Sequence, residues 1–205
     1  MKFILGTKQY MTQLFDEKGR ARAATVVAVS PMTVTQVKDK EKDGYSALQF
    51  GSGTKKHIGK SLKGHLKDLP PFRYIHELRI EGTTDKKVGD TVDISAFAPG
   101  DKVAVSAISK GKGFQGVVKR HGFAGGPRTH GQKHSEREPG SIGGGLRTRV
   151  PKGMRMAGRM GGDRVTVSNL SVLHIDTEKN ELYLSGAIPG RRGTLVEVRA
   201  ERINK

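Results

Sequence analysis

Cysteine is absent from this chain of 205 residues. Its absence excludes disulfides, thiolate zinc sites, iron–sulfur clusters and cysteine nucleophiles from every interpretation of the sequence. It also fits a reducing compartment. Apolar residues make up only 34% of the chain, which is low for a globular protein.

Long hydrophobic runs are absent as well. No apolar stretch approaches the roughly 20 residues that a membrane-spanning helix needs. The chain begins with a short apolar patch at residues 3–5, and the sequence Gly-Thr-Lys-Gln at residues 6–9 then breaks it. This pattern does not match a secretory signal peptide. We therefore expect no membrane partner and a cytoplasmic location.

Positive charge is what the chain has in excess. It has 37 lysines and arginines against 20 acids, a net charge of +17. Residues 110–163, named here the basic loop, hold 15 of the 28 glycines and 12 of these cations but only three acids, a net charge of +9. Such a segment buries too little apolar surface to offset its own ordering entropy. It therefore predicts a polyanionic partner.

The residues on either side of the basic loop favour short β-strands. Compact β-branched runs and apolar–polar alternation predict strands at residues 23–29, 32–37, 45–50, 74–80, 92–94, 103–108, 165–167, 170–175, 181–184 and 195–198. We expect the first two to be consecutive antiparallel strands, and residues 38–44 to form a charged turn. Ile58, Leu62 and Leu66 recur every four residues and predict a short helix within residues 55–67.

This spacing of strands indicates a mainly β chain with a barrel or sandwich. Because strands are predicted on both sides of the basic loop, we expect one domain made of residues 1–109 and 164–205. Residues 110–163 then leave this domain as a long, largely irregular excursion, which is usually a sign of function.

Two glycine motifs resemble phosphate-binding fingerprints. Gly111, Gly113 and Gly116 have the spacing of a dinucleotide-binding turn, but no acid on a following strand completes it. Residues 59–61, Gly-Lys-Ser, match the end of a P-loop, but the first glycine of that motif is missing. We favour glycines that let the backbone approach phosphate, with Lys110, Lys112, Lys119 and Arg120 supplying charge, and a short helix at residues 115–121.

Three histidines of the basic loop, His121, His130 and His134, could suggest a metal site. A cation would be repelled by so basic a loop, so we predict hydrogen bonding or stacking on RNA and no metal. The alternative for the arginine-rich stretch at residues 147–159 is a solvated basic face. Its glycine and proline density instead favours an arm that orders on RNA.

We therefore predict fifteen RNA contacts: Lys110, Lys112, Lys119, Arg120, His121, Arg128, His130, Lys133, His134, Arg137, Arg147, Arg149, Lys152, Arg155 and Arg159. Catalytic constellations are missing: no paired carboxylates lie in an apolar setting, and Ser141 lies in a glycine-rich turn and not in a nucleophile elbow. We expect no enzyme activity and no cofactor or small-molecule substrate.

Several short stretches form a specific pattern along the chain: Ile4-Leu5-Gly6, Met11-Thr12-Gln13, Val34-Thr35-Gln36-Val37, Gly44-Tyr45-Ser46-Ala47, Ser109 to Gly116, Lys119 to Phe123, Gly126-Pro127, Thr129-His130-Gly131, His134, Pro139 to Gly143 and Met156 to Gly161. With these motifs the chain resembles, essentially end to end, the bacterial family of large-subunit ribosomal protein three.

The resemblance implies a closed β-barrel of the translation-protein type. It implies a structural, non-catalytic role in the ribosome: binding of large-subunit rRNA near its 3′ end and help in nucleating subunit assembly. The basic loop would extend toward the peptidyl transferase centre, its tip being Ser141, Ile142, Gly143, Gly144 and Gly145. The partners would be rRNA and neighbouring large-subunit proteins, with no homo-oligomer.

Three positions depart from the family pattern. Tyr10 replaces a frequent glycine, and Ala104 replaces a frequent acidic or amide residue. Gly144 takes the place of a glutamine that is methylated in some members, so this modification is not expected here. Two other classes of function are weighed against the ribosomal one. A nucleoid protein would need a basic helical or dimeric pattern, and an RNA-modifying enzyme would need a cofactor pocket or a catalytic acid.

Overall fold

The computed structural model describes residues 2–80, 85–145 and 148–200. The chain divides into two compact units. Unit 1 combines residues 1–108 with residues 165–205, and unit 2 is Ser109–Arg164. Within the described residues, no helix has both the length and the apolar character that crossing a membrane requires.

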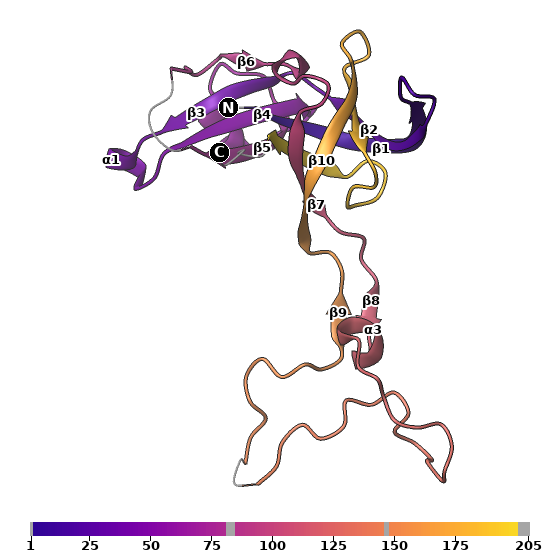
Figure 1. The fold of residues 1–205 in the computed structure, drawn as a ribbon. Coiled ribbons are helices and arrows are strands. Elements are labelled where there is room, and N and C mark those ends of the chain that lie inside the picture. Colours follow the sequence, from indigo (N-terminus) through magenta and orange to yellow (C-terminus); the bar gives the residue numbers. More distant parts are fainter. Residues whose placement is uncertain (1, 81–84, 146–147, 201–205) are drawn as a thin grey trace. The chain divides into compact units, whose positions relative to one another are not determined.

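The larger sheet of unit 1 has a cyclic order of strand pairing. Its strands β1, β2, β7 and β10 are labelled in Figure 1. Its hydrogen-bonded order is β1, β12, β7, β10, β11 and β2, and β2 pairs again with β1. The bounds of these strands are β1 Phe3–Phe15, β2 Ala21–Val29, β7 Lys102–Ile108, β10 Arg164–Asp176, β11 Glu181–Ser185 and β12 Leu195–Ala200. The long β1 closes the order, because it pairs with β12 through residues 3–7 and with β2 through residues 6–8 and 11–15.

A second sheet of unit 1 has the order β5-β4-β3-β6. Its strands are β3 Met32–Lys38, β4 Ala47–Thr54, β5 Phe72–Arg79 and β6 Thr91–Val92. Short helices fill the connections: α1 Lys40–Asp43, α2 Lys60–Leu66 and the 3-10 helix η1 Ile94–Ala96. All strand pairs of this sheet are antiparallel.

One hydrophobic core serves both sheets of unit 1. Phe3 and Leu5 from β1 are buried together with Met32 from β3 and Phe50 from β4. The rings of Phe3 and Phe50 lie 5.6 Å apart between centroids. Gly6 allows β1 to approach β2 closely, since a Cβ there would lie 2.5 Å from Cγ1 of Val27. Burial of β-branched and aliphatic side chains from both sheets holds unit 1 together.

The prediction of a mainly β chain is confirmed, but several details were wrong. Residues 23–29 and 32–37 were expected to pair with each other, yet β2 and β3 belong to different sheets. Pro31 in the two-residue connection does not suit a tight hairpin turn, which favours glycine or asparagine. The two edges of β2 are paired with β1 and β11 instead.

Other boundaries also differ from the prediction. Residues 3–15 form the longest strand besides β10, although Gly6 looked like a break. The charged turn at residues 38–44 contains α1, and the strand expected at residues 92–94 ends at Val92, with Ile94 opening η1. The two strands expected at residues 165–175 are one continuous strand, β10. The helix expected within residues 55–67 is present as α2.

Candidate nucleic-acid interface

Both chain segments at the base of unit 2 are joined by a short ladder, named here the neck. The backbone N–H of Ser109 donates to the carbonyl of Asp163 at 2.8 Å, and that of Lys112 donates to Met160 at 2.9 Å. Strand β8, Gly113–Gln115, then pairs antiparallel with β9, Gly158–Met160 (Figure 1). The neck therefore holds the first and last residues of the basic loop side by side.

Helix α3, Val117–His121, follows β8 and packs within unit 2. Its Val117 is buried, and Gly122 ends it in the left-handed conformation. The Nη1 of Arg120 donates to the carbonyl of Met156 at 2.7 Å, and Nε2 of His121 lies 3.1 Å from the same oxygen. Arg120 and His121, two predicted RNA contacts, are thus half-buried and engaged within the protein.

A compact turn is closed within residues 125–136. The backbone N–H of Gly126 donates to the carbonyl of Glu136 at 3.0 Å, and the amide of Gln132 donates to the hydroxyl of Ser135. The guanidinium of Arg128 pairs with the Glu136 carboxylate at 2.5 Å. Because both partners are largely exposed, this ion pair contributes little stability in water.

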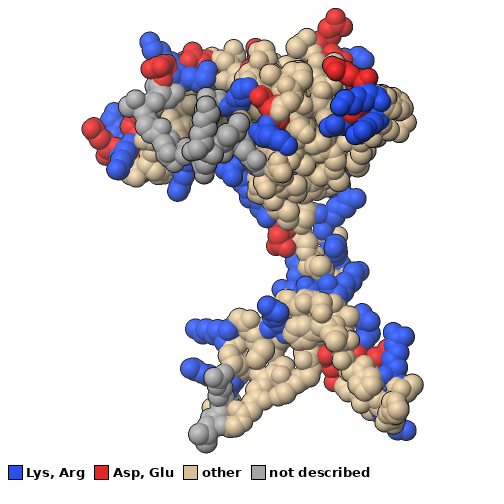
Figure 2. Space-filling view, in the orientation of Figure 1, with Lys and Arg blue, Asp and Glu red and all other residues tan. Residues whose placement is uncertain are grey.

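Most of the predicted RNA contacts are exposed cations or histidines. Figure 2 shows that lysine and arginine predominate among the charged side chains on the visible face of unit 2. Arg147 lies outside the described residues. The exposed members are Lys110, Lys112, Lys119, Arg128, His130, Lys133, His134, Arg137, Arg149, Lys152, Arg155 and Arg159. Flexible cations on glycine-rich backbone suit phosphate contacts better than base reading.

The predicted tip is an exposed turn. The hydroxyl of Ser141 donates to the carbonyl of Gly143 at 2.6 Å, and Gly140 and Gly145 have positive φ values of 78° and 63°. Ile142 is 39% exposed. This turn offers small side chains and open backbone, which permits close approach to a packed partner.

Phe114 was missed as a functional candidate. It lies on β8 and is 77% exposed, opposite Arg159 in the ladder. An exposed aromatic ring beside cations is a typical platform for stacking on an unpaired base. The signal in the sequence was an aromatic residue in a stretch otherwise made of glycine, lysine and glutamine.

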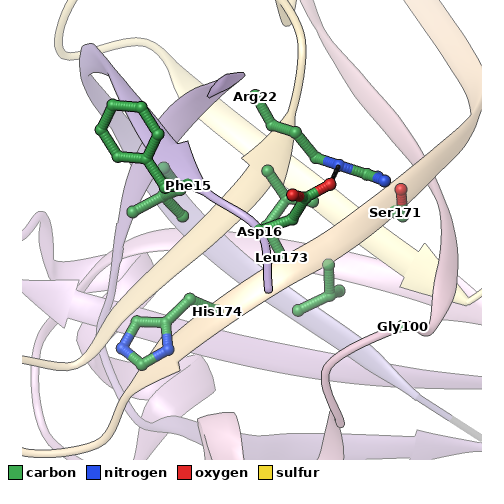
Figure 3. Close-up of a pocket in the computed structure, with 9 residues that line it drawn as sticks. Phe15, Asp16, Arg22, Gly100, Ser171, Leu173 and His174 are labelled. Carbon is green, nitrogen blue, oxygen red and sulfur yellow. Dashed lines mark hydrogen bonds and ion pairs between the residues drawn. The ribbon is translucent and has the colours of Figure 1, made fainter. Parts of the chain in front are cut away.

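A hollow in unit 1 has a volume of about 390 Å³ and is lined by Leu14 and Phe15 from β1 and by residues 171–174 from β10. Figure 3 shows Phe15, Asp16, Arg22 and His174 around it. The carboxyl group of the hollow, Asp16, accepts hydrogen bonds from the backbone N–H groups of Arg20 and Lys18, at 2.9 and 3.0 Å. These bonds, that from Arg20 above all, and the Arg22 guanidinium at 3.3 Å hold the pKa of Asp16 below its usual value. Asp16 therefore fixes the β1–β2 turn and does not resemble a proton donor.

Metal-binding geometry is missing from the described ranges, since no group of three or more histidine, aspartate or glutamate side chains in them is placed to hold an ion. His121 faces Phe123 with ring centroids 6.1 Å apart, so its other contact is aromatic. The three histidines of the basic loop thus have no shared ligand site among these residues.

Comparison with known proteins identifies relatives from the large ribosomal subunit. The sequence profile of the family described as "Ribosomal protein L3" matches residues 79–184. "Large ribosomal subunit protein uL3" of Herpetosiphon aurantiacus is 48% identical, covering 98% of each chain. The protein of that name from Acidothermus cellulolyticus is 48% identical over 97% of this chain and 92% of its own. "Large ribosomal subunit protein uL3c" of Guillardia theta is 44% identical, over 96% and 98%. The chain belongs to the ribosomal protein L3 family.

Proposed function

We propose that this protein is a structural constituent of the large ribosomal subunit and binds large-subunit rRNA directly. The observation that carries the proposal is the similarity to large-subunit proteins over nearly the whole chain: one of them is 48% identical over 98% of it. Support comes from unit 2, whose exposed cations lie on a glycine-rich loop with few acids. The protein would reside with the cytoplasmic ribosome, as one copy among neighbouring large-subunit proteins.

The two units have separate roles in this proposal. Unit 1 is a closed β-barrel of the translation-protein type, an assignment supported by the pairing of β2 with β1 at the end of the strand order. Unit 2 is the part that penetrates rRNA. Two chain segments of roughly 25 residues reach at most about 80 Å when fully extended, at about 3.3 Å per residue. That reach well exceeds the radius of a small domain, which is roughly 15 Å.

Binding would rest on charge and shape. Lysine and arginine neutralise phosphates and release counterions, so affinity falls steeply with salt. Arg128, Arg137 and Arg149 are exposed on irregular backbone, which suits contacts to the RNA backbone more than a fixed pattern of base contacts. Phe114 adds one stacking surface. Binding near the 3′ end of the rRNA would then help to nucleate assembly.

The tip would lie deepest, toward the peptidyl transferase centre. Its role there is to support RNA and not to take part in the reaction, because the Ser141 hydroxyl donates its hydrogen bond to the carbonyl of Gly143 within its own turn. A bulky residue at Gly144 should therefore alter peptide-bond formation indirectly, by shifting RNA. Unchanged peptidyl-transferase kinetics in ribosomes carrying Gly144→Trp would contradict this placement.

The first test is sedimentation of cell lysate through a sucrose gradient, followed by a high-salt wash. We expect the protein to travel with the large subunit in equal number and to survive a wash that strips peripheral proteins. A protein that stays at the top of the gradient or follows DNA would overturn the proposal.

A further inference from the structure

A second concentration of positive charge lies in unit 1, at residues 55–67. This stretch contains Lys55, Lys56, Lys60, Lys63 and Lys67 together with two histidines, and it contains no acid. We name it the lysine segment. It connects β4 to β5 and includes α2. The segment has a net charge of +5 in 13 residues, a higher charge per residue than the +9 in 54 residues of the basic loop. Unlike the basic loop, it belongs to unit 1.

Unit 1 holds the lysine segment in place from its apolar side. Leu66 is 2% exposed, and Ile58 and Leu62 are half-buried. The backbone N–H of Lys55 donates to the carbonyl of Pro71 at 2.9 Å, which ties the start of the segment to the residue just before β5. The ring of His65 lies 2.8 Å from the side-chain oxygen of Gln49 on β4. The five lysine side chains are all exposed.

The surrounding acids do not neutralise these lysines. Lys38, on the same sheet, forms an ion pair of 2.7 Å with Glu77. Across residues 2–80, 85–145 and 148–200, by contrast, no lysine of the segment has an ion pair. Within α2, Lys60 and Lys63 stand three residues apart, a spacing at which like charges repel along a helix. Lys56 precedes the helix and Lys67 is its C-cap, so they add charge at its two ends.

Helix α2 has little stability of its own. The helix has only seven residues, contains Gly64 and has no side-chain cap, and helices this short are marginal without outside support. A partner that supplies negative charge would reduce the repulsion between these lysines and so stabilise α2. Single lysines are suited to individual phosphates. The segment has no phenylalanine, tyrosine or tryptophan to serve as a large platform for stacking on bases.

We propose that the lysine segment is a second RNA-contacting surface, which binds the phosphate backbone of rRNA without reading its sequence. The proposal rests on the proposed function, since rRNA is the polyanion that the protein would meet. It assigns to unit 1 a direct share in the affinity, in addition to that of the basic loop.

The test measures binding of the full chain to protein-free large-subunit rRNA over a series of salt concentrations. The variant is Lys56→Gln, Lys60→Gln and Lys63→Gln combined. The matched control is Lys18→Gln, Lys40→Gln and Lys42→Gln, which removes the same charge from exposed lysines that stand beside acids in the sequence. We expect the first variant to lower the slope of log K against log salt by about 2 and to weaken binding between tenfold and a hundredfold at about 0.1 M salt. The control should match the unaltered chain.

A second variant of the basic loop separates the two proposals. Arg149→Gln, Lys152→Gln and Arg155→Gln together should weaken binding whether or not the lysine segment takes part. If this variant binds weakly while the lysine-segment variant matches its control, the inference is wrong and the proposed function stands. If the unaltered chain prefers rRNA no more than unrelated duplex DNA, the proposed function itself is wrong.

A measurement on the unaltered protein avoids any effect of substitution on folding. Acetylation of the free chain should modify Lys56, Lys60 and Lys63 as readily as Lys18 and Lys40, because all are exposed. In the rRNA complex we expect modification of the first three to fall several-fold and that of the other two to stay unchanged. Equal modification of both groups in the complex would overturn the inference.

Discussion

Gly161 shows how a single residue can hold the neck together. Its φ is +75°, and a Cβ at this position would overlap the carbonyl of Lys110. The same neck contains the hydrogen bond from the Lys112 N–H to the carbonyl of Met160. Glycine is therefore required both by the backbone conformation and by the close approach of the two segments.

We expect Gly161→Ala to open the neck. The left-handed conformation alone costs a residue with a Cβ about 1–2 kcal/mol, and the overlap adds to this. Hydrogen exchange of the Lys112 amide should consequently become roughly tenfold faster or more. The control is Gly111→Ala, where a Cβ meets no described atom within 4 Å. Equal protection in both variants would show that the neck is not formed in solution.

Glu77 is the centre of a polar network on β5. It accepts hydrogen bonds from the Lys38 ammonium, at 2.7 Å, from the Tyr45 hydroxyl, at 2.8 Å, and from the amide of Gln49, at 3.2 Å. The bond from Lys38, followed by that from Tyr45, lowers the pKa of Glu77 below its ordinary value of 4.5. In turn, Glu77 raises the pKa of Lys38.

The sign of this shift predicts an acid-labile contribution to stability. Because the folded pKa lies below the unfolded one, the contribution is present above pH 4.5 and is lost as the pH falls through the folded pKa. Glu77→Gln should destabilise the protein by on the order of 1 kcal/mol at about pH 7, and by less at about pH 3. Urea unfolding at both values measures this. Glu178→Gln, at an exposed turn residue, should show neither effect.

At the scale of an element, α3 links two parts of unit 2 through one arginine. The guanidinium of Arg120 donates to the carbonyl of Met156, 36 residues later in the chain. Gly158 leaves room for this guanidinium, because a Cβ at position 158 would lie 2.6 Å from Nη1 of Arg120. This contact gives Arg120 a structural role that the exposed Arg155 does not share.

Arg120→Met and Arg155→Met should therefore differ in the free protein and in the complex. We expect Arg120→Met to speed hydrogen exchange in α3, since the helix loses its tie to Met156. Arg155→Met should leave exchange unchanged but lower the salt dependence of rRNA binding by about 0.7, the value of one phosphate contact. If the α3 amides of Arg120→Met exchange no faster than those of Arg155→Met, the Arg120 contact does not stabilise α3.

Local sequence patterns predicted most of the strands but not their partners. Alternation and β-branched runs identified the positions of β3, β7, β11 and β12, because burial on one or both faces determines which residues are apolar. The partner of β2 depended on β1, whose residues Lys8 to Gln13 are largely polar and irregular in register. Long-range pairing of this kind leaves no mark in a short window of sequence.

The sequence predicted the positive charge of the candidate interface but not the hydrogen bonds within it. The excess of cations over acids in residues 110–163 is a property of composition, so it could be recognised without a fold. The engagement of Arg120 and His121 with Met156 could not be recognised, because it depends on the neck bringing β8 and β9 together. Phe114 lies in the same β8–β9 pair, and its exposure likewise could not be read from the sequence.

At the scale of the whole molecule, unit 1 should fold without the basic loop. The N–H of Ser109 lies 2.8 Å from the carbonyl of Asp163, and the hydroxyls of Ser106 and Thr166 lie 2.8 Å apart. β7 and β10 are therefore already neighbours where the loop begins, and an Asn-Gly turn can replace residues 110–162.

We expect this shortened chain to unfold cooperatively and within a few degrees of the full protein, because its core residues are all in unit 1. Its binding to rRNA should be weaker, with a salt slope lower by about 0.7 for each phosphate that the absent loop would have neutralised. Calorimetry and the binding series measure the two effects. Absence of the cooperative transition would show that unit 1 depends on unit 2.

The neck has a consequence for the order of events during assembly. A chain with a free end can thread through a gap that is one strand wide, but the basic loop is fixed at both ends. It can enter an RNA interior only as two strands side by side, and it cannot be pulled through a ring of RNA that has already closed. Under the proposed function, the RNA would therefore have to close around the loop. The protein would then bind early in assembly, and its release would require the surrounding RNA to open.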